Sequence, residues 1–182
     1  KMVKYSSEEI LKEQKLIFKE IIDFVNDMSC DCDKFKGTAT VQVLREHLSL
    51  KGYNVSDRDV YIKGIPNELD LLVLRKNVDK SFIIYNPEDV IFVFEIKYNS
   101  TTNLKHLLSV YNCIMKRNNK INCAYVTILD QNSWTKVFTK EAIGFDYFVF
   151  YTYRSTTRML PEMDMGGWKK LLKYLEENNQ NS

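Results

Sequence analysis

Two strand-like runs, Leu69–Leu74 and Val90–Lys97, carry charged residues where a buried strand would have apolar ones. Asp70 lies inside the first run, and the second run ends in Glu-Ile-Lys. Because side chains alternate across a strand, Glu95 and Lys97 share one face and the isoleucine between them faces the other. Charges in a buried sheet are costly unless they are paired or bind an ion. The three charged residues therefore predict a single site.

A shared divalent-metal site accounts for all three charges. Asp70 and Glu95, on adjacent strands, offer the hard oxygen ligands that Mg²⁺ and Mn²⁺ prefer. The backbone carbonyl of Ile96 is a candidate for a further oxygen ligand. Such a metal polarises a phosphate oxygen and helps to generate hydroxide, while Lys97 would orient the nucleophile or stabilise the developing negative charge. This chemistry predicts phosphodiester hydrolysis.

The chain as a whole alternates between helical and strand-like hydrophobic patterns. Ser6 or Ser7 is the expected N-cap of the first helix, and the polar segment 29–37 is expected to be a loop. At 182 residues, with no internal repeat or linker, the chain is expected to form one mixed α/β domain (1–182). We predict helices over about 6–28, 38–51, 103–116, 134–141 and 168–177, and strands within 53–62, 69–74, 90–96, 121–129 and 147–151.

Composition and charge exclude some classes of protein. The longest apolar runs are far shorter than the roughly 18–20 residues that cross a bilayer. The N-terminus turns acidic where a secretory signal would be apolar, so we expect a cytoplasmic protein. Cys30 and Cys32 stand closer together than the cysteine pairs common in zinc sites, and we assign the cysteines no chemistry. A net charge of +2 neither requires nor excludes a nucleic-acid partner.

Asp70, followed on the next strand by Glu95-Ile96-Lys97, resembles the motif of the PD-(D/E)XK nuclease superfamily. The core of that superfamily is a helix, a three-stranded antiparallel meander, a helix and a strand, and residues 38–129 are similar to it in element order. The resemblance implies a mixed α/β, restriction-endonuclease-like fold. Residues 1–37 would then form an N-terminal helical extension, and residues 130–182 a C-terminal α/β extension.

The resemblance also implies roles for the charged residues. Asp70 and Glu95 would be metal ligands, and Lys97 would be the catalytic lysine. The proline of the motif is poorly matched, because Pro66 stands four residues before Asp70 rather than beside it.

Four further residues are singled out by the same resemblance. Members often add a carboxylate from the first core helix, where this chain offers Glu46, with Gln42 one turn earlier on roughly the same face. Lys105 and Tyr98 follow the motif, where related nucleases often contact phosphates or support the lysine, although each alone is more typical of a surface or core residue. His47, beside Glu46, is more typical of a structural histidine than of a manganese ligand.

These patterns together predict a Mg²⁺- or Mn²⁺-dependent endonuclease that cleaves DNA in preference to RNA. A homodimer would suit the cutting of two strands, and the apolar stripe of helix 6–28 could supply its interface or equally pack on its own core. The alternative is a catalytically inactive nuclease-fold module that binds nucleic acid or a protein partner. It stays open because Glu-X-Lys at a strand end is also a common solvated ion pair.

Overall fold

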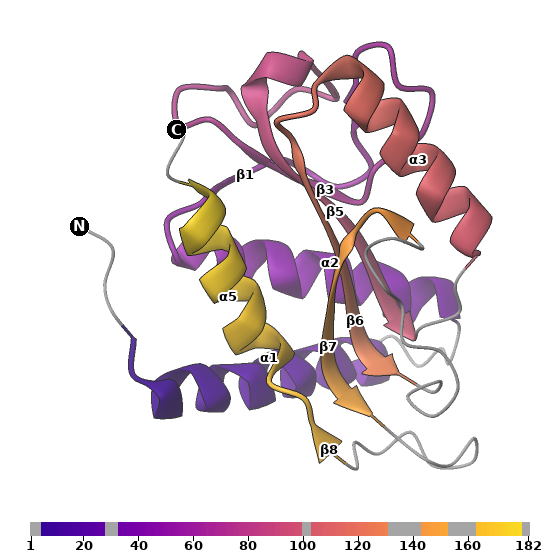
Figure 1. Ribbon diagram of the computed structural model, residues 1–182. Coiled ribbons are helices and arrows are strands. Elements are labelled where there is room, and N and C mark those ends of the chain that lie inside the picture. Colours follow the sequence, from indigo (N-terminus) through magenta and orange to yellow (C-terminus); the bar gives the residue numbers. More distant parts are fainter. Residues whose placement is uncertain (1–4, 28–32, 100–102, 131–142, 153–162, 180–182) are drawn as a thin grey trace.

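The structure of the protein is a computed structural model, which describes residues 5–27, 33–99, 103–130, 143–152 and 163–179 (Figure 1). The expected helix over 134–141 lies outside the described residues. The helices are α1 (Ser7–Asp27), α2 (Asp33–Leu50), η1 (Pro87–Asp89), α3 (Leu104–Arg117) and α5 (Gly167–Asn178). The strands are β1 (Asn54–Val55), β2 (Tyr61–Ile62), β3 (Leu71–Leu74), β4 (Ile84–Tyr85), β5 (Val90–Asn99), β6 (Asn122–Asp130), β7 (Asp146–Thr152) and β8 (Met163–Asp164).

The strands form a mixed sheet with the order β1-β3-β5-β6-β7-β8, and β2 and β4 form a separate parallel pair. β3 runs antiparallel to β5, with Leu71 opposite Phe94. β5, β6 and β7 run parallel to one another, with Lys97 beside Thr127 in the first of these two pairings. The antiparallel meander β1-β3-β5, preceded by α2 and followed by α3 and β6, has the element order that the resemblance implies for 38–129.

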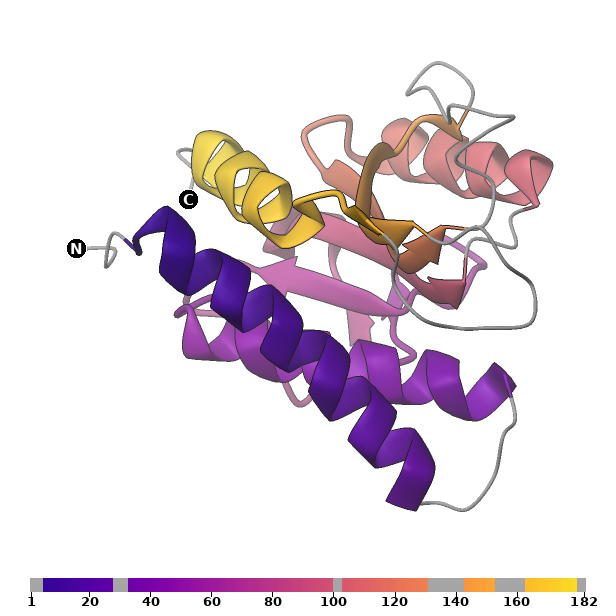
Figure 2. The same ribbon diagram turned by 90° about the horizontal axis from the view of Figure 1, so that it is seen from below.

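Helices cover both faces of the sheet (Figure 2). α1, α2 and α5 lie on one face, where Leu44, Phe94 and Trp168 belong to one buried apolar cluster. α3 lies on the other face, where Val93 and Ile114 belong to a second cluster. The sheet therefore separates two environments, and each strand residue contributes to one or the other.

A capping box begins α1, as the expected N-cap predicts. The backbone N–H of Glu9 donates to Ser6 Oγ (3.2 Å), and the backbone N–H of Ser6 donates to the Glu9 carboxylate (2.7 Å). Ile17, Ile21 and Val25 form the buried stripe of this helix. Among the described helices, none combines the length and the apolar character that crossing a bilayer requires.

Two predicted elements differ in extent from those of the structure. α2 begins at Asp33 and not near residue 38, so the end of the expected loop is helical. Phe35 in its first turn stacks on Phe24 of α1 (ring centroids 6.3 Å apart), and this tertiary contact outweighs the polar composition of the segment. The expected strand over 53–62 is two short strands, β1 and β2, and Asp59 between them has a left-handed φ of 56°, which interrupts a strand.

Candidate active site

The ends of two paired strands bring Asp70, Glu95 and Lys97 together. Lys97 Nζ lies 2.7 Å from Glu95 Oε1 and 3.4 Å from Asp70 Oδ2. The backbone N–H of Ile96 donates to the same Asp70 oxygen at 2.7 Å. Val93 faces α3, and side-chain alternation places Glu95 and Lys97 on that face as well. The structure thus groups the three residues that the sequence predicts.

The charges of this group shift one another's protonation. Burial and the neighbouring Glu95 charge raise the pKa of Asp70 to about 6, although Lys97 and the Ile96 N–H act in the opposite direction. Burial disfavours the charge on Lys97, but the two carboxylates outweigh it and raise the pKa of Lys97 above its ordinary value. The side chains of Asp70, Glu95 and Lys97 are 23%, 12% and 39% exposed. The group is therefore sheltered but reachable from solvent through the lysine.

The donor atoms present fit a divalent metal ion that keeps part of its water shell. Asp70 and Glu95 supply two carboxylates, and the described residues contain no cluster of three or more His, Cys, Asp and Glu side chains that could hold a metal. The N–H and C=O of one residue in an extended strand point to the same edge, so the Ile96 carbonyl is directed to the side where Asp70 lies. Oxygen ligands from two side chains and one carbonyl, with water or phosphate completing the shell, suit Mg²⁺ or Mn²⁺.

The first core helix does not bring its expected carboxylate to this group. Glu46 is exposed and accepts a hydrogen bond from Gln42 Nε2 (2.6 Å). Both residues belong to α2, whose apolar side packs on the face of the sheet opposite to Lys97, with Leu44 in the Phe94 cluster. Because the sheet lies between them, neither Glu46 nor Gln42 has a contact with the three site residues in the part of the chain that is described.

The two residues expected to contact substrate have different environments. Tyr98 is only 3% exposed and belongs to the apolar cluster beneath α1 and α2, on the face of the sheet away from Lys97, a position that does not favour the expected substrate contact. The physical reason is alternation, since Tyr98 is one position from Lys97 and must face the other side. Lys105 is exposed in the first turn of α3, which begins shortly after β5 ends, and it remains a candidate.

Sequence analysis missed a polar chain on the strands next to the site. Thr127, the register partner of Lys97 on β6, is fully buried, and its hydroxyl lies 3.1 Å from the hydroxyl of Tyr147. Tyr147 donates to the Asp130 carboxylate at 3.2 Å, and Asp130 is also buried. The signal available in the sequence was a threonine and an aspartate within an otherwise apolar strand. These residues extend the polar environment of the site across β6 and β7.

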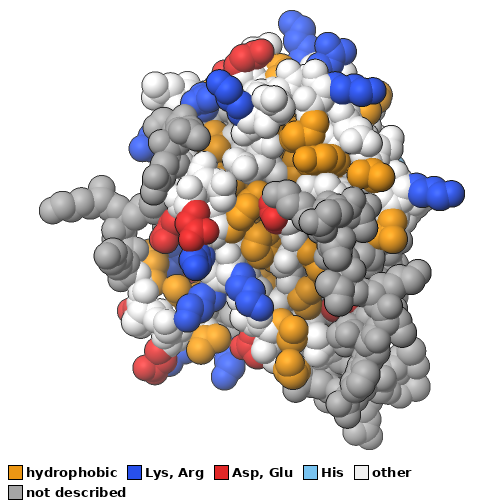
Figure 3. Space-filling view, viewed as in Figure 1, with side chains coloured by type: hydrophobic (Ala, Val, Ile, Leu, Met, Phe, Trp, Pro, Cys, Tyr) orange, Lys and Arg blue, Asp and Glu red, His pale blue; other side chains and the backbone are white. Residues whose placement is uncertain are grey.

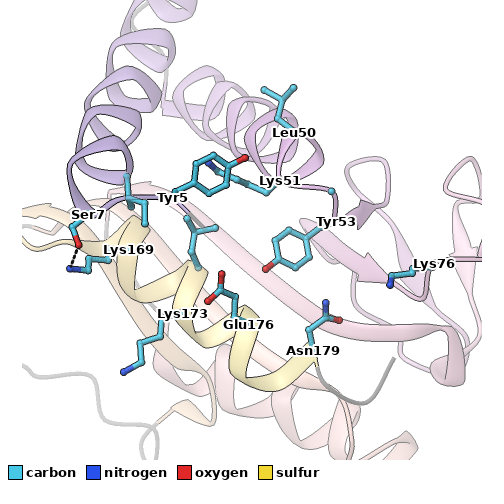
Figure 4. A pocket seen from close by; sticks show the side chains of 13 residues that line it. Tyr5, Ser7, Leu50, Lys51, Tyr53, Lys76, Lys169, Lys173, Glu176 and Asn179 are labelled. Carbon is cyan, nitrogen blue, oxygen red and sulfur yellow. Dashed lines mark hydrogen bonds between the residues drawn. The ribbon is translucent and has the colours of Figure 1, made fainter. Parts of the chain in front are cut away.

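A second candidate site lies on the other face of the sheet, which α1, α2 and α5 cover. It is a cavity of about 660 Å³ between the start of α1, the end of α2 and α5 (Figure 4). Lys and Arg side chains also gather over α5 on the surface seen in Figure 3. Four lysines line the cavity, together with aromatic side chains: Lys51, Lys76, Lys169, Lys173, Tyr5 and Tyr53.

Contacts within the cavity hold several of these side chains in place. Lys51 Nζ lies 3.3 Å from the centre of the Tyr5 ring, and Lys169 Nζ donates to Ser7 Oγ at 3.1 Å. Burial and the nearby Glu176 carboxylate raise the pKa of Tyr53 to about 12, so this tyrosine stays neutral. Lysines and neutral aromatic rings thus line the cavity together with one carboxylate, Glu176, and an excess of lysines beside aromatic rings suits an anionic ligand with a planar group.

No family model matches the chain, and no curated protein matches it. Solved structures of NucC match it over nearly its whole length. NucC of P. aeruginosa ATCC27853 in its cAAA-bound form has a TM-score of 0.63 at 13% identity, covering 97% of this chain and 92% of that one. NucC of E. coli MS115-1 matches with a TM-score of 0.62 at 13% identity in its cAAA-bound form (97% and 91% covered). Its apo form matches with a TM-score of 0.54 at 14% identity (98% and 93% covered).

At these identities the likeness concerns the fold. The helices on both faces, the mixed sheet and the match with NucC agree with the fold that the motif resemblance implies. The chain therefore has a mixed α/β, restriction-endonuclease-like fold.

Proposed function

We propose that the chain is a metal-dependent nuclease that hydrolyses phosphodiester bonds at Asp70, Glu95 and Lys97. The observation that carries the proposal is the contact of one lysine with two carboxylates from paired strands, at 2.7 and 3.4 Å. An ordinary ion pair needs one carboxylate, whereas here a second one lies close by, and burial and the neighbouring carboxylate raise the pKa of Asp70. The restriction-endonuclease-like fold supports the same function, although folds alone do not determine activity.

Each residue has a distinct part in the proposed reaction. Asp70 and Glu95, with the Ile96 carbonyl, would hold Mg²⁺ or Mn²⁺, which when bound polarises the phosphate and favours ionisation of a water. The Ile96 N–H fixes the Asp70 carboxylate in position. Lys97 stays protonated beside the two carboxylates and would place its positive charge next to the phosphate in the transition state. We propose DNA as the favoured substrate, with Lys105 as a backbone contact.

The test compares metal binding and cleavage in variants of the same residues. Asp70→Asn and Glu95→Gln should abolish Mg²⁺ or Mn²⁺ binding in calorimetry and also abolish cleavage. Lys97→Met should retain metal binding but lower the cleavage rate by about 10²–10³, the usual effect of removing one transition-state donor. Single- and double-stranded DNA and RNA are supplied in parallel to identify the substrate.

Two surface carboxylates provide matched controls. Glu68 is exposed and accepts a hydrogen bond from the Tyr61 hydroxyl, while Glu46 is exposed on α2. Glu68→Gln and Glu46→Gln should leave metal affinity and cleavage unchanged. Full cleavage by Lys97→Met, or metal binding that survives both Asp70→Asn and Glu95→Gln, would contradict the proposal. A lysine-carboxylate group without metal binding or cleavage would favour the inactive, binding-only module.

We also propose that the lysine-lined cavity binds an anionic ligand. The four lysines and the two tyrosines favour this second function. cAAA is the first ligand to test, because it is bound in structures of NucC that share this fold. Calorimetric titration with cAAA should show binding that Lys76→Glu abolishes and that the distant variant Lys63→Glu retains. Equal binding by both variants would place the ligand elsewhere, and no binding by the unchanged protein would exclude cAAA.

A further inference from the structure

A buried ion cluster joins the first, second and last helices. His47 of α2 lies between two carboxylates of α1, with Nδ1 3.1 Å from Glu13 Oε1 and Nε2 2.8 Å from Glu20 Oε2. Glu13 also accepts from Lys51 Nζ (2.6 Å) and from the indole N–H of Trp168 in α5 (2.9 Å). The side chains of His47 and Glu13 are 7% and 15% exposed. We refer to these five residues as the ion cluster.

The geometry of the ion cluster requires a doubly protonated His47. A neutral imidazole has a single N–H, so one of its nitrogens would turn a lone pair toward a carboxylate oxygen. Here both ring nitrogens are within hydrogen-bond distance of carboxylates. Burial disfavours the charged ring, but the hydrogen bonds to Glu13 and Glu20 outweigh it and raise the pKa of His47 above its ordinary value.

The other charges in the ion cluster depend on that proton. His47 and Lys51 balance the two carboxylates, and Trp168 is the group that α5 contributes to the ion cluster. Burial raises the pKa of Glu13, but its three donors lower it more strongly, to about 2, so Glu13 stays ionised. Loss of the proton from His47 would leave a buried excess of negative charge and one carboxylate without a donor, both of which are costly.

We propose that the proton on His47 holds α1 against α2 and α5, and that α1 loosens when this proton is lost. The charged groups facing His47 in the described part of the chain are Glu13 and Glu20 from α1 and, through Glu13, Lys51 in the turn that follows α2. The inference is independent of the nuclease proposal. It also concerns the lysine-lined cavity, because Lys51 and the start of α1 both line it.

The direction of the pH effect follows from the sign of the shift. A basic group whose pKa is higher in the folded protein than in the unfolded chain stabilises the fold fully below the unfolded value, about 6.5 for histidine. This contribution is lost as the pH rises through the folded value. We therefore expect α1 to be firmly packed near pH 6 and less firmly packed at alkaline pH.

The chain contains two histidines, His47 and His106, which makes the test direct. In His106→Gln the remaining ring signals in NMR belong to His47, and their titration gives the pH at which His47 loses its proton. Hydrogen exchange of α1 amides is measured over the same pH range and divided by that of α3 amides in the same sample. The division removes the intrinsic pH dependence of exchange.

We expect His47 to titrate above its ordinary range and the relative protection of α1 to fall about tenfold or more through that titration, as the loss of one charge-assisted hydrogen bond implies. Glu20→Gln, which alters a half-exposed partner and should fold normally, should lower the titration midpoint and weaken the protection step. His47→Gln should remove the step. Unchanged relative protection of α1 across the His47 titration, or a step that persists in His47→Gln, would overturn the proposal.

Discussion

The protonation of Asp70 offers a sharp prediction about the candidate active site. Its pKa of about 6, against an ordinary value of 3.8, corresponds to about 3 kcal/mol at about 1.36 kcal/mol per unit. The contribution of Asp70 to stability is then greatest below pH 3.8 and falls by that amount as the pH rises past 6, because the folded protein binds the Asp70 proton more tightly than the unfolded chain does. Carbon-detected NMR of the aspartate carboxyl groups in metal-free protein measures the pKa directly.

Two further measurements follow from the same pKa. About a tenth of Asp70 is ionised at pH 5 and about nine tenths at pH 7, so Mg²⁺ should bind roughly tenfold more weakly at pH 5. Lys97→Met removes a cation that lowers the pKa of Asp70, so that pKa should rise further, whereas Lys12→Met on the surface of α1 should leave it unchanged. An Asp70 that titrates near 3.8, or that ignores the loss of Lys97, would refute the reasoning.

The remaining predictions concern stability and are measured by urea unfolding. Gly167→Ala should cost about 1–3 kcal/mol, because its new methyl group would lie 2.2 Å from the backbone oxygen of Val149. Gly37→Ala lies inside α2, with nothing within 4 Å of the new methyl group, and should instead stabilise the fold by about 0.5–1 kcal/mol through helix propensity. Because the two glycine substitutions should have opposite signs, each serves as the control for the other. Gln14→Leu should cost about 1–3 kcal/mol, because the buried backbone N–H of Trp168 loses the Gln14 amide oxygen to which it donates at 2.9 Å. An unchanged urea midpoint would contradict this prediction.

The sequence predicts the site residues best where local rules act alone. A charge within an apolar strand is recognisable by itself, and alternation then places Glu95 and Lys97 on one face. The same rule puts Tyr98 on the other face, in the apolar cluster, a position that the family resemblance does not take into account. The distance of Glu46 from the site depends on how α2 packs against the sheet, and no local sequence pattern determines that packing.

The features on the face of the sheet that α1, α2 and α5 cover were not predictable in this way. The lysine-lined cavity combines Tyr5 just before α1, Lys51 just after α2 and Lys173 in α5, which lie far apart in the sequence. The two partners of His47 lie on α1, and nothing in the sequence around His47 identifies them. Such contacts arise from how helices dock, so they become visible only in three dimensions.

The packing of α1 beside α5 has a consequence for how the chain is made (Figure 2). Gln14 of α1 accepts from the backbone of Trp168, 154 positions later, so this contact between α1 and α5 forms only after α5 has emerged from the ribosome. Until then the stripe formed by Ile17 and Ile21 lacks the α5 part of the apolar cluster in which it is buried. Contacts between segments so far apart in the sequence also slow folding, because α1 and α5 must meet before either helix is stabilised by the other.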